Sequence, residues 1–384
     1  MRRSVKAVMV FAVVVAAAMP AARGRVLADD SAQILTIDHY LQVKSTVPAI
    51  AGQPAQVYLR ERVAAGPALR ARSFTDRVVL FVHGAGTPAE VSFDAPHEGY
   101  SWMAYLAAAG FDVFSVDMTG YGRSTRPPQM SDPCNLPADK QRSFVPALLP
   151  APCAPTYAGN MTTIASDWDE VGAAVDYIRA LRRVEKVGLL GWSLGGPRSG
   201  GYAARHPEKV SRMVWLTPAY DRASDAGPPA KVPTDGTVYN TQSRAEFQAN
   251  WDRQVGCPAQ YEPQVADAVW AANLEADPVG ATWGPGVRRA PQTTMWGWNA
   301  GVVSKMQIPT LMIAAAHDKQ VDPARVRDLY DDYGAKEKVL IDLGCASHSA
   351  MWDKVRTHVF RSSLEWLEKG SVNGMQTGVV KLGY

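Results

Sequence analysis

A serine held between two glycines is the residue best suited to covalent chemistry in this chain. The pentapeptide Gly191-Trp192-Ser193-Leu194-Gly195 directly follows the apolar run 187–190 and precedes a helical pattern rich in alanine and glycine. A chain that turns this sharply from strand to helix holds the serine in a strained conformation, and the glycines avoid collisions within the turn. The helix N-terminus beneath the serine favours a developing negative charge. We therefore expect Ser193 to act as a nucleophile.

A serine hydroxyl is a weak nucleophile at neutral pH, so a nearby base must take its proton. The chain has 7 histidines, and His348 is the one that lies between the last expected strand, 339–343, and the final helical pattern, 351–369. Ligands of open α/β sheets bind at the carboxyl ends of the strands, which is where this histidine is expected. We therefore expect His348 to be the base.

The base in turn needs a carboxylate that fixes its tautomer and stabilises the imidazolium. Asp318 follows the expected strand 310–315, where an acidic side chain would point into the same crevice. Asp322 directly precedes Pro323, so it fits the cap of a helix better and remains the alternative acid. The expected order along the chain is nucleophile, acid, base.

Strands and helices alternate along most of the chain, and these elements must position the three side chains. Short all-apolar runs are typical of central parallel strands that are covered on both faces. With the helices between them, they predict an α/β fold on a doubly wound, mostly parallel sheet, preceded by antiparallel strands in 33–63. The expected strands are 78–82, 111–118, 187–192, 210–216, 310–315 and 339–343, and the expected helices are 100–110, 163–183, 194–206, 323–333 and 351–369.

Two long stretches interrupt this alternation. Residues 124–160 contain eight prolines and are expected to form an ordered excursion rather than a helix. Residues 221–303 separate two strands that a short link could join, and an insertion of this size is usually functional. This insertion contains five of the 11 tryptophans and is expected to form a helical cap. Its tryptophans either fill a core of their own or form the underside of a lid over the substrate.

Residues 1–28 are typical of a secretory signal peptide. Arg2, Arg3 and Lys6 precede an apolar run of 13 residues, and Val26-Leu27-Ala28 fits a small-x-small cleavage site. The run is shorter than the roughly 20 residues that a membrane span needs. We therefore expect a secreted or periplasmic protein whose mature chain does not insert into a membrane. Without residues 1–28 the chain has 35 basic and 37 acidic residues, so we expect no nucleic-acid partner.

The four cysteines, Cys134, Cys153, Cys257 and Cys345, are consistent with an oxidising compartment. Of the three possible pairings, Cys134–Cys153 with Cys257–Cys345 is favoured, because the first bridge would close the proline-rich excursion; free buried thiols are the alternative. No Cys/His pair has the spacing of a zinc site, and no phosphate-binding or dinucleotide-binding glycine motif occurs. We expect neither a metal nor a cofactor.

Two further motifs complete a resemblance to the α/β-hydrolase superfamily over about residues 55–370. His83-Gly84-Ala85-Gly86 resembles the family's HGxG segment, and 117–124 resembles its D-x-x-G-x-G-x-S turn. The resemblance implies an oxyanion hole formed by the backbone N–H groups of Ala85 and Leu194, and a tetrahedral oxyanion does require two preorganised donors. It also implies that residues 29–384 form one α/β-hydrolase domain, with the insertion in the position of the family's cap.

A serine nucleophile predicts acyl transfer, normally to water, and the expected substrate is a carboxylic ester or lactone. The apolar cap favours a small-to-medium molecule with an apolar or aromatic part. The candidate pocket residues are Tyr121, Trp192, Trp296 and Trp298.

Two alternatives stay open. A secreted peptidase that resembles the proline iminopeptidases would use cap carboxylates to hold a substrate amine, and the insertion carries Glu246, Asp252, Glu262, Asp267, Glu275 and Asp277. A binding protein on the same scaffold would hold a ligand without turnover, although the complete set of nucleophile, acid and base disfavours it. The sequence gives no indication of the oligomeric state.

Overall fold

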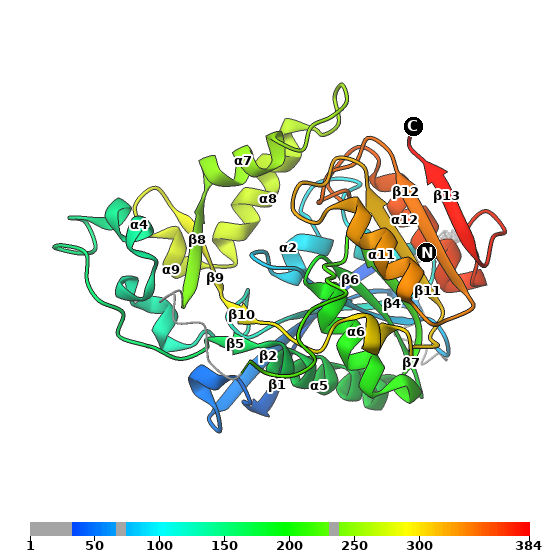
Figure 1. Ribbon diagram of the computed structural model, residues 1–384, viewed down its shortest axis with the longest axis horizontal. Helices are drawn as coiled ribbons and strands as arrows, with labels where there is room; N and C mark the ends of the chain where they lie inside the picture. The colour runs from blue at the N-terminus through cyan, green and yellow to red at the C-terminus, as the bar shows by residue number, and fades with distance from the viewer. Residues whose placement is uncertain (1–32, 67–73, 230–237) are drawn as a thin grey trace, which may run out of the picture. The chain divides into compact units, whose positions relative to one another are not determined.

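The computed structural model describes residues 33–66, 74–229 and 238–384. Within these ranges, nine strands form one central sheet (Figure 1). In their order across the sheet, the strands are β1 (Ile34–Lys44), β2 (Pro54–Ala64), β4 (Asp112–Asp117), β3 (Val78–Val82), β6 (Val187–Trp192), β7 (Val210–Leu216), β11 (Thr310–Ala315), β12 (Lys338–Leu343) and β13 (Gly378–Leu382).

The strand directions confirm the predicted fold class. β1 runs antiparallel to β2, and β2 runs antiparallel to β4. Every neighbouring pair from β4 to β13 is parallel. β3, β4, β6 and β11 are buried at every residue, as strands covered on both faces must be. β13 comes from a C-terminal segment to which the sequence pattern assigns no element.

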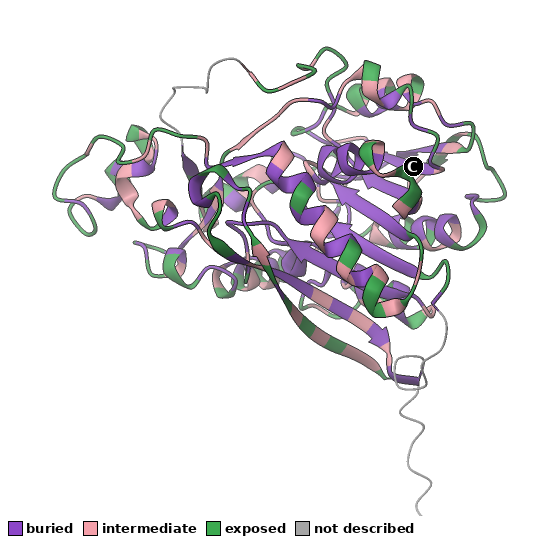
Figure 2. Cartoon of the chain, turned by 90° about the horizontal axis from the view of Figure 1, so that it is seen from below, coloured by how far each residue is buried: buried purple, intermediate pink, exposed green. Residues whose placement is uncertain are grey.

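Helices cover both faces of the sheet, so successive side chains of one strand enter different cores. Leu190 of β6 packs in the cluster that contains α3 and α12, whereas Leu189 packs in the cluster that contains α5, α6 and α11. Figure 2 shows the buried strands between helices whose outer sides are exposed. The helices outside the insertion are α2 (Ala89–Phe93), α3 (Trp102–Ala108), α4 (Ala138–Gln141), α5 (Ile164–Arg182), α6 (Gly195–Arg205), α11 (Pro323–Asp332) and α12 (Arg356–Lys369).

The segment between β7 and β11 contains strands as well as the predicted helices. β8 and β9 pair antiparallel, and β10 pairs parallel with β5, which precedes α5. Figure 1 shows α7 and α8 of this segment packed side by side. Its elements, with β5, are β5 (Thr162–Thr163), β8 (Tyr239–Ser243), α7 (Arg244–Asp252), α8 (Pro263–Glu275), α9 (Pro278–Ala281), β9 (Val287–Pro291), β10 (Thr293–Thr294) and α10 (Ala300–Val303).

Most of the aromatic side chains in this segment pack internally or against the sheet domain. Trp251 and Trp270 lie against Phe247, with ring centroids 5.9 Å and 5.6 Å away. Trp298 is buried, whereas Trp296 is partly exposed. The tryptophans therefore serve largely as core, with Trp296 the more exposed of this last pair.

The proline-rich excursion consists of short 3₁₀ turns and α4, and a disulfide closes it. Cys134 is bonded to Cys153, with the two Cα atoms 5.3 Å apart. Gln141 of α4 bridges the same two residues, because its amide nitrogen donates to the Cys134 carbonyl and its oxygen accepts the Cys153 N–H. The second disulfide joins Cys257 to Cys345. These are the two pairs that the sequence analysis favours.

The expected signal peptide lies outside the residues that the structure describes. In the described ranges, no helix combines the length and the apolar character that a bilayer crossing requires.

Candidate active site

Ser193 occupies the turn between β6 and α6. Its φ is +55°, a left-handed conformation that is rare for a residue with a side chain and that marks a strained functional turn. The flanking glycines allow this turn. A Cβ at Gly195 would lie 2.1 Å from the Val82 carbonyl oxygen, and one at Gly191 would lie 2.4 Å from that of Gly195. The Ser193 side chain is thereby presented at the carboxyl edge of the sheet, where it is partly exposed.

Asp318 and His348 meet at the same edge, at the ends of β11 and β12. The Nδ1 atom of His348 lies 2.7 Å from Oδ2 of Asp318, and both side chains are buried. The other carboxylate oxygen of Asp318 accepts the N–H groups of Gln320 and Val321, at 2.7 Å and 2.9 Å. The Nδ1–H tautomer of His348 donates to Asp318 and leaves Nε2 available as a base.

Asp322 has a different role in the same turn. Its carboxylate accepts the N–H of Ala324 at 2.9 Å, which caps α11 at its N-terminus. Of the two candidate acids, Asp318 is the one that the structure brings to His348.

Two side chains hold the backbone of His348, one from the last residue of β6 and one from the residue that follows β7. The indole nitrogen of Trp192 donates to the His348 carbonyl oxygen at 2.8 Å, and the Thr217 hydroxyl donates to the same oxygen at 3.1 Å. Trp192 is buried, with its ring centroid 5.5 Å from that of His348. Trp192 was expected to line the pocket, and here its indole supports the histidine loop.

The segment after β3 approaches Ser193 closely. A Cβ at Gly84 would lie 2.8 Å from the Ser193 Cβ, so only glycine permits this approach. The polar groups of the segment are fixed by partners on several elements. Arg198 donates to the Gly84 carbonyl at 3.1 Å, the Tyr121 hydroxyl accepts the Gly86 N–H at 3.2 Å, and Arg288 donates to the Gly86 carbonyl.

Two amides near Ser193 are left without an acceptor. In the part of the chain that the structure describes, neither the Ala85 N–H nor the Leu194 N–H donates a hydrogen bond. Ala85 is exposed and Leu194 is partly exposed. A ligand can therefore approach the backbone at these two residues. Tyr121, the second expected pocket residue, is buried and braces this segment through its hydroxyl.

His83 stabilises the same segment as a neutral imidazole. Its Nδ1 atom lies 2.7 Å from the Gly84 carbonyl, and its Nε2 atom accepts the Met118 N–H at 3.1 Å. Complete burial, together with the adjacent Arg198 guanidinium, holds the pKa of His83 well below its ordinary value. This neutral state fits both hydrogen bonds, because one ring nitrogen donates and the other accepts.

Buried charged side chains support α6 and, separately, the turn after β4. Arg198 forms an ion pair with Asp167 at 2.6 Å, and both side chains are almost fully inaccessible. Asp117 accepts the N–H groups of Ala89 and Arg123, at 2.7 Å and 3.2 Å, which fixes the glycine-rich turn. Burial, with a smaller effect of Glu90, raises the pKa of Asp117 to about 7.

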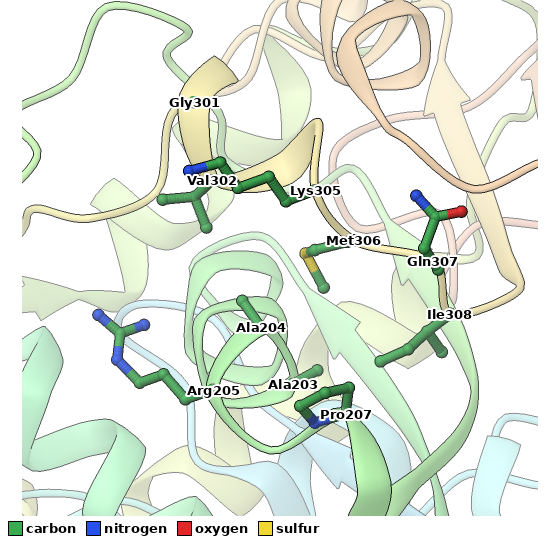
Figure 3. Close-up of a pocket in the computed structure, with 10 residues that line it drawn as sticks. All are labelled: Ala203, Ala204, Arg205, Pro207, Gly301, Val302, Lys305, Met306, Gln307 and Ile308. Carbon is green, nitrogen blue, oxygen red and sulfur yellow. The ribbon is translucent and has the colours of Figure 1, made fainter.

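Two cavities adjoin α6, at opposite ends of the helix. A cavity of about 210 Å³ is lined by Leu194, Met295, Trp296 and Trp298, and therefore lies beside the nucleophile turn. A second cavity, of about 480 Å³, lies between the C-terminal end of α6 and residues 301–308 (Figure 3). Because α6 has 11 residues at about 1.5 Å each, roughly 16 Å separates its two ends. The second cavity is therefore not part of the site around Ser193.

Comparison with known proteins agrees with this arrangement. The sequence profile of the alpha/beta hydrolase fold family matches residues 77–355, which is well over half of the chain. The chain belongs to the alpha/beta hydrolase family. The matched range includes Ser193, Asp318 and His348, and it also includes the whole insertion.

Solved structures share the fold of this hydrolase at low sequence identity. A serine hydrolase involved in carbazole degradation gives a TM-score of 0.50 at 16% identity, covering 86% of this chain and 99% of its own. A serine hydrolase from the polyaromatic hydrocarbon-degrading bacterium Cycloclasticus zankles gives a TM-score of 0.50 at 14% identity, with 86% and 98% covered. A search of curated proteins finds no match. At such identities the likeness concerns the fold.

Some residues that this hydrolase places around the site carry no sequence signal. Arg198 and Arg288 reach the Ala85 segment from α6 and β9, and Gln254 reaches the histidine loop from the insertion. Each is a common residue type outside any motif, and each acts across more than 90 residues of sequence. Only the folded chain identifies them.

Proposed function

We propose that this hydrolase cleaves a carboxylic ester or lactone through an acyl-enzyme on Ser193. The observation that carries the proposal is the 2.7 Å contact between His348 Nδ1 and Asp318 at the edge of the sheet where the strained Ser193 turn lies. A histidine oriented in this way by a buried carboxylate is a base for a serine hydroxyl. The two amides without acceptors support the assignment of Ala85 and Leu194 as the oxyanion hole.

The proposed reaction has two halves. His348 Nε2 takes the Ser193 proton as Oγ attacks the carbonyl carbon, and the imidazolium donates through Nδ1–H to Asp318. The Ala85 and Leu194 amides stabilise the oxyanion, and the imidazolium then protonates the leaving alkoxide as the ester bond breaks. In the second half, His348 removes a proton from water, which attacks the acyl-enzyme. The carboxylic acid leaves, and the proton returns to Ser193.

Three of the six candidate carboxylates in the insertion already have cationic partners, which favours an ester over the aminopeptidase alternative. Asp267 pairs with Arg244 at 2.7 Å, and Asp277 pairs with Arg289 at 2.6 Å. Glu246 pairs with Lys140. A carboxylate that already has a cationic partner is a poor anchor for a substrate ammonium group.

The cavity beside Leu194 supports a substrate with an apolar part. Met295, Trp296 and Trp298 are among its apolar lining residues, and its volume of about 210 Å³ suits a small acyl or alcohol group. We also propose that the protein is exported, because its two disulfides suit an oxidising compartment. Protein recovered from the periplasm or medium should then begin at Asp29.

A fluorophosphonate probe tests the proposed function directly. The folded wild-type protein should be labelled on Ser193, as located by peptide mass spectrometry, and both Ser193→Ala and His348→Ala should abolish labelling. Labelling at another residue, or none in a protein that is folded by circular dichroism, would reject the acyl-enzyme. Rates on an aryl ester and on an aminoacyl anilide then separate the esterase from the peptidase.

A further inference from the structure

Gln254 connects the two catalytic loops from outside the sheet domain. It follows α7 in the insertion, and its side chain is 2% exposed. Its Oε1 atom accepts the backbone N–H of His348 at 3.0 Å and that of Lys319 at 3.3 Å. Lys319 directly follows Asp318, so one oxygen atom holds both the loop of the base and the loop of the acid.

The orientation of this amide is determined by its other hydrogen bond. Nε2 of Gln254 donates to the Asn250 carbonyl oxygen at 2.7 Å, within the turn that ends α7. If the amide were flipped, its NH₂ group would face the N–H groups of His348 and Lys319, and its oxygen would face the Asn250 carbonyl oxygen. The oxygen therefore faces the catalytic loops.

The loop that carries Gln254 is itself fixed. The Gln260 amide donates to the Gln254 carbonyl at 3.0 Å, and its oxygen accepts the Gly256 N–H at 2.9 Å. Cys257 in the same loop is covalently bonded to Cys345, three residues before His348. Gln254 is thus a buried acceptor, and hydrogen bonds and a disulfide hold the loop that carries it.

A second buried acceptor holds the histidine loop next to Gln254. Asp353 accepts the Ser347 N–H at 2.6 Å and the Trp251 indole N–H at 3.1 Å. Two side chains therefore bind the consecutive N–H groups of Ser347 and His348. Each of these side chains also forms a hydrogen bond with a residue of the insertion. These hydrogen bonds hold in place the backbone from which the imidazole of His348 extends.

We propose that Gln254 is a positioning residue of the hydrolytic site, which keeps the loops of Asp318 and His348 in register so that the imidazole remains aimed at Ser193. The proposal rests on the proposed function of these three residues. Gln254 does not touch the reacting atoms, and it acts through the backbone of the base and of the residue next to the acid. The insertion therefore supplies a residue that positions the catalytic loops.

Two substitutions of Gln254 separate this role from general stability. Gln254→Met keeps the length of the side chain and removes the acceptor. Gln254→Glu keeps an acceptor for both N–H groups and, while its carboxyl group is protonated, a donor to the Asn250 carbonyl oxygen. Gln248→Met is the matched control, because Gln248 on α7 bonds Arg244, Asp252 and Tyr261 within the insertion and contacts neither catalytic loop.

We expect Gln254→Met to lower kcat per fluorophosphonate-titrated site by about 10- to 100-fold with KM changed less than about twofold. Gln254→Glu should retain most of kcat while its buried carboxyl group is protonated. It should lose kcat at higher pH, where the ionised carboxylate would face the Asn250 carbonyl oxygen. Gln248→Met should match the wild type in both respects. Equal kcat per titrated site in Gln254→Met and the wild type would overturn the proposal.

A readout that needs no turnover distinguishes failure of this proposal from failure of the proposed function. The proton between His348 Nδ1 and Asp318 should give a downfield ¹H NMR signal that is absent in His348→Ala. It should weaken or disappear in Gln254→Met and persist in Gln248→Met. If wild-type Ser193 is not labelled but the signal responds in this way, the hydrolytic function fails and the positioning role stands. A signal unchanged in Gln254→Met overturns the positioning role.

Discussion

Asp318 and Asp322 are of the same residue type and lie four positions apart, yet their carboxylates have different tasks. Asp318 lies 2.7 Å from the His348 imidazole, whereas Asp322 caps α11. Asp318→Asn should lower kcat by roughly 10³- to 10⁴-fold with little change in the unfolding midpoint, because the imidazole loses the carboxylate that orients it. Asp322→Asn should retain kcat, and Asp322→Ala should lower the unfolding free energy by about 1 kcal/mol.

Steady-state kinetics and thermal unfolding of these three variants check the assignment. A loss of activity in Asp322→Asn that equals the loss in Asp318→Asn would contradict it.

Trp296 is the residue through which the insertion is best placed to contact a ligand. It is partly exposed and lines the cavity beside Leu194, whereas Trp298 is buried. Trp296→Ala should raise KM for an aryl or medium-chain ester by about tenfold, since apolar contact area is lost, and should leave KM for an acetate ester nearly unchanged. Measuring KM across a chain-length series tests this. An unchanged KM for every ester would place Trp296 outside the pocket, and an equal rise for every ester would contradict a contact with the apolar chain.

At the scale of elements, α5 braces the catalytic edge of the sheet with a buried carboxyl group. Glu170 of α5 accepts the Thr119 N–H at 2.8 Å, just after β4. Burial, with a smaller effect of Asp167, raises the pKa of Glu170 from 4.5 to about 7. A carboxyl group whose pKa is higher in the folded state binds its proton more tightly there, so it stabilises the fold most below its unfolded pKa.

The unfolding free energy should therefore fall as pH rises from about 4.5 to 7, by up to about 3 kcal/mol from this group. Glu170→Gln should reduce the slope of that part of the pH profile, to which Asp117 also contributes. Asp169→Asn, an exposed position on the same helix, is the control and should keep it. Urea unfolding at a series of pH values measures the slope. An identical slope in Glu170→Gln and the wild type would show that Glu170 is not the group responsible.

At the scale of the whole molecule, the two disulfides connect different parts of the chain and should have different effects. The Cys134–Cys153 bridge closes the proline-rich excursion over 19 residues, and the Cys257–Cys345 bridge joins the insertion to the histidine loop over 88 residues. From loop-closure entropy, replacing each pair by serine should lower the unfolding free energy by about 3 and about 4.5 kcal/mol.

The two serine pairs should differ more clearly in activity. Removal of the Cys134–Cys153 bridge should leave kcat per titrated site unchanged, because the bridge lies away from the catalytic loops. Removal of the Cys257–Cys345 bridge should lower kcat as well as stability, since the loop with Gln254 loses its covalent link to the loop with His348. Chemical denaturation and active-site-titrated kinetics of both pairs provide the measurement. Equal kcat in the two pairs would reject the link between insertion and catalysis.

The sequence by itself determined the elements of the sheet and the candidate residues at their ends. The short apolar runs predicted the parallel strands of the central sheet other than β13, namely β3, β4, β6, β7, β11 and β12. A strand buried on both faces must consist almost entirely of apolar residues. The glycines around Ser193 predicted the sharp turn, since backbone contacts near 2 Å exclude a side chain there. Each of these signals lies within one short segment, so a single sequence is enough to reveal it.

Only the tertiary structure decided which of these residues meet and what supports them. The distance between Asp318 and His348, the hydrogen bonds of the Trp192 indole and the Tyr121 hydroxyl, and the strand β13 all depend on contacts between distant segments. The contacts of Arg288 and Gln254 are of the same kind, since each is a polar side chain held by backbone groups from another part of the chain. Such contacts depend on how elements pack rather than on the residue pattern within any one of them, so the sequence pattern could not reveal them.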